Sequence, residues 1–153
     1  MNFLILFYVP LLLIMAISFE NWKHGMSEHI FKTTGCNAFS GAGICPRPKQ
    51  NATILRSVDG TPYYDDDLSD INNVKYTLFG HNGDQDVNEK KFNKPLLASE
   101  NIYLYRVKID GKKKEYIWYG KYEIVETTTK INPGKDGVDR NIIILSLQKI
   151  DSV

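Results

Sequence analysis

The sequence has few of the side chains on which catalytic and metal sites depend. Its 153 residues include two cysteines and three histidines, and no Cys-x-x-Cys pair occurs. His24 and His29 are five residues apart, whereas two zinc-binding histidines on one helix face are about four apart. No neighbouring residue marks Cys36 or Cys45 as an activated nucleophile. We therefore expect no catalytic residue, no metal site and no cofactor in this chain.

The chain also lacks a large excess of charge. Its formal net charge is +1, so no overall positive field attracts it to nucleic acid. A basic patch nevertheless occurs between residues 106 and 121. Its basic members are Arg106, Lys108, Lys112, Lys113, Lys114 and Lys121. Asp110-Gly111-Lys112 within it has the composition of a hairpin turn. The patch is either a solvated turn or a loop that follows DNA phosphates.

The N-terminus has no charged residue before Glu20. Residues 3–17 are almost entirely apolar, which is marginal for a membrane span and typical of the hydrophobic region of a signal peptide. Ala16-Ile17-Ser18 has the small-x-small pattern of a cleavage site, although the usual preceding basic residues are missing. We expect residues 1–18 to be a signal peptide or membrane anchor and residues 19–153 to form the domain. A buried apolar segment and an over-extended start are the alternatives.

Two further features accord with secretion. Asn51-Ala52-Thr53 is a glycosylation sequon, and Cys36 and Cys45 are able to form one disulfide. Reduced cytosolic thiols are the alternative for the cysteines. These features leave the compartment open.

Short runs of β-branched and aromatic residues, separated by turn residues, predict strands. The expected strands are residues 53–58, 75–79, 101–109, 115–126 and 141–147. Within residues 101–109, two sets of side chains alternate and should lie on opposite faces of the sheet. One set is Ile102, Leu104 and Arg106, and the other is Tyr103, Tyr105 and Val107.

The segments between the strands are less regular. Residues 36–49 are rich in glycine and proline and predict a loop, whereas residues 22–32 and 88–97 predict a short helix or irregular structure. We expect a mainly β (α+β) fold, with a compact, curved antiparallel sheet or barrel and a few short helices.

Residues 62–85 contain the side chains needed to hold a single nucleobase. Tyr64 is followed three residues later by Asp67 and nine residues after that by Tyr76. Aromatic rings stack on the faces of a base that has left the duplex, and a carboxylate accepts a hydrogen bond from an amine such as cytosine N4. Taken alone, these residues are more typical of ordinary core or surface tyrosines and a polar turn at residues 65–67 than of a base pocket.

An ordered set of motifs gives this segment a context. It consists of Gly41-Ala42-Gly43-Ile44, Tyr64-Asp65-Asp66-Asp67, Tyr76-Thr77, Gly80-His81-Asn82-Gly83-Asp84-Gln85, Asn93-Lys94-Pro95-Leu96, Tyr116-Ile117-Trp118-Tyr119-Gly120 and Arg140-Asn141-Ile142-Ile143-Ile144-Leu145. In this order, over roughly residues 25–150, the chain resembles the SRA (SET- and RING-associated, or YDG) domain. It is most similar to the SRA-like heads of modification-dependent HNH restriction endonucleases.

The resemblance implies a PUA-like β-barrel that recognises a modified base, most often modified cytosine, in double-stranded DNA. It implies that Tyr64 and Tyr76 enclose the flipped base, that Asp67 contacts its Watson–Crick edge and that Thr77 lines the pocket. Leu78 stands where the family usually has glycine, so a narrower or reshaped pocket is expected.

The same resemblance suggests residues that contact the DNA backbone. The expected contacts are Gly83, Lys94, Lys112, Lys113 and Lys114. Asn93, beside Lys94, is expected to brace the chain locally.

Two other functions remain open. The chain is alternatively the DNA-recognition subunit or a fragment of a modification-dependent restriction endonuclease, acting with an HNH nuclease partner, because the nuclease of such enzymes is a separate domain. It is alternatively a secreted or membrane-anchored interaction protein, attached through residues 3–17, with an SRA-like barrel that has lost DNA binding. A DNA reader would be nuclear or cytoplasmic.

Overall fold

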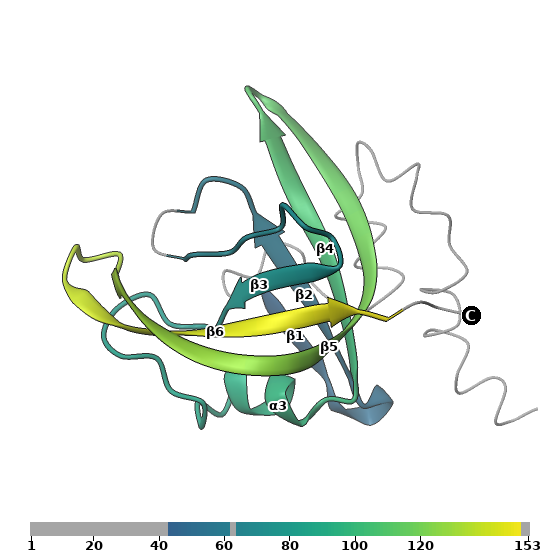
Figure 1. The fold of residues 1–153 in the computed structure, drawn as a ribbon, viewed down its shortest axis with the longest axis horizontal. Coiled ribbons are helices and arrows are strands. Elements are labelled where there is room, and N and C mark those ends of the chain that lie inside the picture. Colours follow the sequence, from purple (N-terminus) through teal and green to yellow (C-terminus); the bar gives the residue numbers. More distant parts are fainter. Residues whose placement is uncertain (1–42, 62–63, 151–153) are drawn as a thin grey trace, which may run out of the picture.

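The computed structural model describes residues 43–61 and 64–150, and the strands of this part form one curved sheet (Figure 1). Their bounds are β1 Ile44–Arg47, β2 Ala52–Val58, β3 Asn73–Thr77, β4 Asn101–Asp110, β5 Lys113–Pro133 and β6 Asp139–Lys149. A short 3-10 helix, η2 (Pro48–Gln50), and an α-helix, α3 (Asn93–Ala98), complete these elements. The predicted mainly β fold is confirmed.

The sheet has the order β1-β2-β4-β5-β6-β3. Four of its pairs are antiparallel, but β2 and β4 are parallel, with Ala52 opposite Asn101 and Val58 opposite Val107. A parallel pair needs a long crossover, and the chain between β2 and β4 supplies it and contains both β3 and α3. The loop that carries the acidic cluster is part of this crossover, so it lies beside the end of β2.

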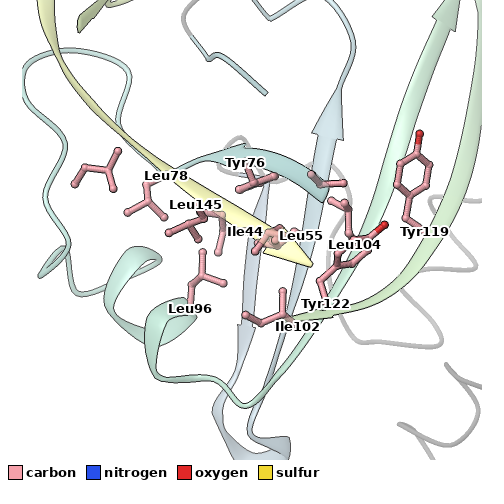
Figure 2. Packing of buried hydrophobic residues seen from close by; sticks show 13 residues of the cluster. Ile44, Leu55, Tyr76, Leu78, Leu96, Ile102, Leu104, Tyr119, Tyr122 and Leu145 are labelled. Carbon is pink, nitrogen blue, oxygen red and sulfur yellow. The ribbon is translucent and has the colours of Figure 1, made fainter. Parts of the chain in front are cut away.

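The alternation predicted for residues 101–109 is confirmed. Ile102 and Leu104 belong to the main core, together with Leu55, Leu96 and Leu145. Figure 2 shows Leu78, Leu96 and Leu145 close together, with Leu96 coming from α3. The other set packs in a second cluster, which consists of Ala52, Ile54, Tyr103, Tyr105 and Val107.

Two boundaries differ most from the prediction. The expectation of a loop at residues 36–49 is wrong for Ile44–Arg47, because these four residues pair with β2 as strand β1. Strand pairing overrides local glycine and proline content there. β5 extends to Pro133, seven residues beyond the expected end, because β6 pairs with it from Tyr122 to Pro133.

The hairpin predicted at Asp110-Gly111-Lys112 is confirmed. Asp110 pairs with Lys113, and Gly111 has a φ of 60°, a conformation that glycine adopts without strain. The β4–β5 hairpin rises from the sheet in Figure 1, at the opposite end of the view from α3.

Several predictions fall outside the described residues. They concern the leader at residues 1–18, the short helix at residues 22–32, and the side chains of His24, His29 and Cys36. Cys45 is not a free thiol, but its predicted pairing with Cys36 stays a prediction. Among the described residues, no helix is long and apolar enough to cross a membrane.

Candidate base-binding pocket

A cavity of about 690 Å³ lies where the end of β2 meets the acidic loop. Residues 56–61 and 66–69 supply most of its wall, and Gly43, Tyr64, Tyr76 and Arg106 complete it. Pockets of about 300–1,000 Å³ hold small organic ligands. The cavity is therefore large enough for a base.

Tyr76 links the two ends of the curved sheet at this cavity. Its side chain is 3% exposed, and its hydroxyl donates to the carbonyl oxygens of Gly43 and Arg56, each at 3.0 Å. Burial raises the pKa of Tyr76 well above its ordinary value of 10.0, so the phenol stays protonated and remains a donor. These bonds fix the Tyr76 ring in the pocket wall to the backbone of β2 and of Gly43, which directly precedes β1.

Tyr64 approaches the cavity from the loop. Its hydroxyl lies 3.3 Å from Nδ1 of His81, and the two ring centroids are 5.8 Å apart. The pKa of His81 is lowered, first by burial and then by Lys135 and Arg140, so the imidazole is neutral at pH 7. The structure thus brings Tyr64 and Tyr76, the two predicted aromatic residues, to the same cavity.

Asp66 presents a carboxylate to this cavity, and sequence reasoning did not single it out. Oδ2 accepts a hydrogen bond from the Ser57 hydroxyl, and Oδ1 accepts one from the Thr77 amide, both at 2.7 Å. Desolvation is the largest influence on its pKa, which lies above the ordinary value of 3.8 despite those two donors. A carboxylate accepts about four hydrogen bonds, so Asp66 retains acceptor capacity.

Asp67 also belongs to the lining of the cavity, and the expectation that it contacts the base stays a prediction. It lies at the rim of the cavity and is exposed, and its Oδ1 accepts from both the amide (2.9 Å) and the hydroxyl (2.6 Å) of Ser69. These bonds lower its pKa. Its backbone pairs with Lys75 in an isolated bridge. Asp67 therefore stabilises a turn, while its neighbour Asp66 faces the interior.

Thr77 is buried, but it is not part of the cavity wall. Its hydroxyl accepts the amide of Asp65 at 2.9 Å. The carboxylate of Asp65 in turn forms an ion pair with Lys130 on β5. Thr77 and Lys130 thus tether the acidic loop to β3 and β5.

Leu78 is 0% exposed and packs in the main core. It does not contribute to the cavity wall, so the structure does not bear out the expectation that this residue narrows the pocket.

The sequence patterns also did not predict a second set of polar residues in the wall of the cavity. Asp59 and Arg106 form a bidentate ion pair, with Nε–Oδ1 at 2.8 Å and Nη2–Oδ2 at 2.9 Å. Arg106 also lies 3.4 Å from the hydroxyl of Tyr119. Asp59 follows β2, and Arg106 belonged to the expected basic patch. Only the parallel pairing of β2 with β4 brings them together, so a single sequence carries no signal for the pair.

In the Gly80–Gln85 turn, by contrast, the polar side chain of Gln85 binds main-chain groups. The amide of Gln85 donates to Leu78 O (2.7 Å) and Gly80 O (3.2 Å), and its oxygen accepts from the Ile143 amide (2.8 Å). Asn93, 0% exposed, similarly bridges both backbone groups of Phe79 and the carbonyl of Asp86. The prediction that Asn93 braces the chain is confirmed.

The predicted backbone-contact residues do not form one surface. Lys112, Lys113 and Lys114 are exposed at the tip of the β4–β5 hairpin. The β4 strand of this hairpin contributes Arg106 to the wall of the cavity. Lys94 is exposed on α3, at the other end of the view in Figure 1. Gly83 is exposed, with a φ of 70°. The described residues contain no cluster of three or more His, Cys, Asp or Glu side chains that would hold a metal ion.

Comparison with known families identifies this arrangement. Residues 22–153 match the family model described as "ScoMcrA-like, SRA domain". The chain belongs to this family. The SRA family binds modified DNA, and the matched region is an SRA domain without an evident nuclease domain. No curated protein matches the chain.

Solved structures share the fold of this SRA domain. The modification-dependent TagI restriction endonuclease matches with a TM-score of 0.60 and 20% identity over 82% of this chain. The sulfur-binding and SRA domains of ScoMcrA, solved with phosphorothioated DNA, match with a TM-score of 0.61 and 20% identity over 82%. The chain spans 47% and 37% of those two proteins.

The SUVH5 SRA domain, solved with methylated CHH DNA, matches with a TM-score of 0.58 and 18% identity. This match covers 82% of the present chain and 83% of the other. At such identities the likeness concerns the fold.

Proposed function

We propose that this SRA domain binds double-stranded DNA and holds a flipped, modified cytosine in the pocket between Tyr64 and Tyr76. Asp66, rather than Asp67, accepts the hydrogen bond from the N4 amine. The observation that carries this proposal is the position of the Asp66 carboxylate in a cavity that both tyrosines line. Asp67 makes its hydrogen bonds to Ser69 instead.

The free energy gained from stacking and from base contacts is comparable to the free energy that flipping the base costs. Flipping a base costs a few kcal/mol, and stacking on an aromatic ring returns about 1–3 kcal/mol. A contact that reads a base edge contributes about 1–3 kcal/mol of discrimination. The bonds from Ser57 and Thr77 hold the Asp66 carboxylate in place before DNA arrives, so little side-chain freedom is lost on binding.

Affinity for the DNA backbone must come from local charge, because the net charge is only +1. The lysines at the tip of the β4–β5 hairpin are suited to this role. Lys113 lies opposite Asp110, four residues beyond the pocket residue Arg106. That separation corresponds to about 13 Å along a strand. Phosphates flanking a base held in the pocket are therefore within reach of the hairpin, whereas Lys94 on α3 is a weaker candidate.

A binding titration with Asp66→Asn and Asp67→Asn tests the assignment. The substitution at Asp66 replaces an acceptor with an amide group while keeping the shape of the side chain. We expect it to weaken binding to a duplex with one modified cytosine by about ten- to hundredfold, corresponding to 1–3 kcal/mol. Asp67→Asn should change binding less than threefold. Equal losses in both variants, or no preference of the parent for a modified duplex, would contradict the proposal.

A second function is favoured by the size of the matched proteins. TagI is a restriction endonuclease, and this chain spans 47% of it. The SRA domain is accordingly a candidate recognition part of a nuclease system with a separate HNH partner. Cleavage of modified plasmid by this chain together with an HNH protein encoded beside it, and by neither alone, would support that function. No cleavage by the mixture would count against it.

A further inference from the structure

The wall of the pocket beside Asp66 is polar and charged. Ser57 and Arg106 are cross-strand partners on β2 and β4, so their side chains share a face of the sheet. Asp59, two residues beyond Ser57, lies on the same face and binds Arg106. A continuous row therefore runs from the Asp66 carboxylate through Ser57 to the Arg106–Asp59 pair.

This wall is polar without being positively charged. The Nε and Nη2 groups of Arg106 are directed at Asp59, so the two charges offset each other. Over the whole lining, three carboxylates face two guanidinium groups: Asp59, Asp66 and Asp67 against Arg56 and Arg106. An anionic substituent would gain nothing here. A neutral group that both donates and accepts hydrogen bonds would suit the dipolar pair.

The row suits the C5 position of the base in the orientation that turns the C5 edge, rather than the N3 edge, toward Ser57. In cytosine, C5 is bonded to C4, which carries the N4 amine. If Asp66 holds that amine, a substituent on C5 emerges directly beside Asp66, where Ser57 and the Arg106–Asp59 pair are within the same wall. The volume of about 690 Å³ leaves room for a substituent well beyond the pyrimidine ring.

We infer that this pocket selects a cytosine whose C5 substituent carries hydroxyl groups, from hydroxymethyl to a neutral sugar, over one that carries a bare methyl group. The inference rests on the proposed function. A methyl group gains affinity from a close apolar wall, and burying one contributes only a small hydrophobic term. A site that hydrogen-bonds a hydroxyl group instead discriminates strongly against an analogue that lacks it, because its own polar groups are then left unpaired.

The experiment is a binding titration of the full chain against duplexes that differ at one position. The four duplexes carry cytosine, 5-methylcytosine, 5-hydroxymethylcytosine or glucosylated 5-hydroxymethylcytosine. We expect at least one hydroxylated duplex to bind about tenfold more tightly than the methylated one, a difference of about 1.4 kcal/mol. The double variant Arg106→Met with Asp59→Ala removes both charges and the hydrogen-bonding groups of the pair together, so neither charge is left without its counter-charge.

The double variant should lose the tenfold preference, because its affinity for the hydroxylated duplex should fall by more than its affinity for the methylated one. The matched control is Lys49→Gln with Glu100→Gln, which also removes one positive and one negative charge, from exposed positions outside the pocket wall. This control should keep the preference. Melting temperatures of all variants separate a loss of selectivity from a loss of folding.

The other outcomes are distinguishable. If 5-methylcytosine binds as tightly as both hydroxylated bases, the inference is wrong while the proposed function stands. If no modified duplex binds better than unmodified DNA, the proposed function itself fails and the inference fails with it. A preference for hydroxylated bases that persists in the folded double variant would overturn the assignment to Arg106 and Asp59.

Discussion

The acidic loop at residues 64–67 and the turn at residues 80–85 are both polar and lie on either side of β3, yet they use their side chains in opposite ways. In the turn, both ends of the Gln85 amide bind main-chain groups. In the loop, Asp66 accepts two hydrogen bonds and faces a cavity. The first arrangement leaves little capacity for a ligand, and the second retains it.

The difference follows from where strand pairing ends. The ladder between β3 and β6 stops at Thr77, and the carbonyls of Leu78 and Gly80 need partners beyond it. Buried main-chain groups without partners are costly, so the Gln85 amide replaces the missing strand. In the acidic loop this duty is smaller, because Asp66 binds one main-chain group, the Thr77 amide, and the backbone of the loop is tethered by Thr77 and by the Asp67–Lys75 bridge. A motif can therefore be a signature of the fold without contacting a ligand.

Removing the brace should have the largest effect on stability. Gln85→Ala deletes three hydrogen bonds and leaves the Leu78 carbonyl and the Ile143 amide without this partner. We expect the free energy of unfolding to fall by about 2–4 kcal/mol, measured by urea denaturation. Gln148→Ala, at an exposed position on β6, is the control and should change it by less than about 0.5 kcal/mol. Equal stabilities of the two variants would remove the proposed contrast between turn and loop.

Neutralising the pocket carboxylate should have a smaller effect of opposite sign. The pKa of Asp66 is raised by burial, so the folded protein bears a cost for the charged form at neutral pH. As the pH falls through that raised pKa towards 3.8, the folded state of the parent takes up a proton and this cost disappears. Asp66→Asn should therefore melt at the same temperature as the parent or higher at pH 7, with the difference vanishing near pH 4.

The pH series has an internal control. Asp67 has a lowered pKa, so its contribution to stability is present above its ordinary pKa of 3.8 and is lost as the pH falls through the lowered value. Asp67→Asn should accordingly melt at or below the temperature of the parent at pH 7. A lower melting temperature for Asp66→Asn than for Asp67→Asn at pH 7 would contradict the assignment of the two carboxylates.

Replacing the hairpin lysines should have the smallest effect, and it should change the affinity for DNA rather than the stability of the fold. Replacing Lys112, Lys113 and Lys114 with glutamine should weaken DNA binding roughly severalfold at moderate salt. It should also reduce the slope of log affinity against log salt by about 0.9 for each phosphate that the protein no longer neutralises. The ratio of affinities for modified and unmodified duplex should stay unchanged, because phosphate contacts carry no base information. A changed ratio would mean that the hairpin takes part in reading the base.

Much of this protein could be predicted from local pattern. Alternation in residues 101–109 predicted which side chains face the main core, and it did so because successive residues of a strand point to opposite faces. The resemblance to the SRA domain, rather than local pattern, implied a shared pocket for Tyr64 and Tyr76, and the fold brings both residues to one cavity. β1 was missed because its four residues lie in a segment rich in glycine and proline and become a strand only through pairing with β2.

The choice among the acidic residues was beyond local pattern. Asp65, Asp66 and Asp67 are chemically identical neighbours, and no spacing rule separates them. In the structure, the first pairs with Lys130, the second turns inward to Ser57, and the third closes a turn with Ser69. The bridge between Asp67 and Lys75 fixes this order, because it sets which side chain of the loop points inward.

The sequence by itself determined the β-rich character of the fold and the faces of its central strand, because each depends on residues close together in the chain. The tertiary structure alone decided that Asp66 is the inward carboxylate, that Leu78 belongs to the core, and that Arg106 meets Asp59 across the parallel β2–β4 pair. Those positions depend on the register between segments that are distant in the chain. That register is set by the burial and hydrogen bonding of the whole sheet.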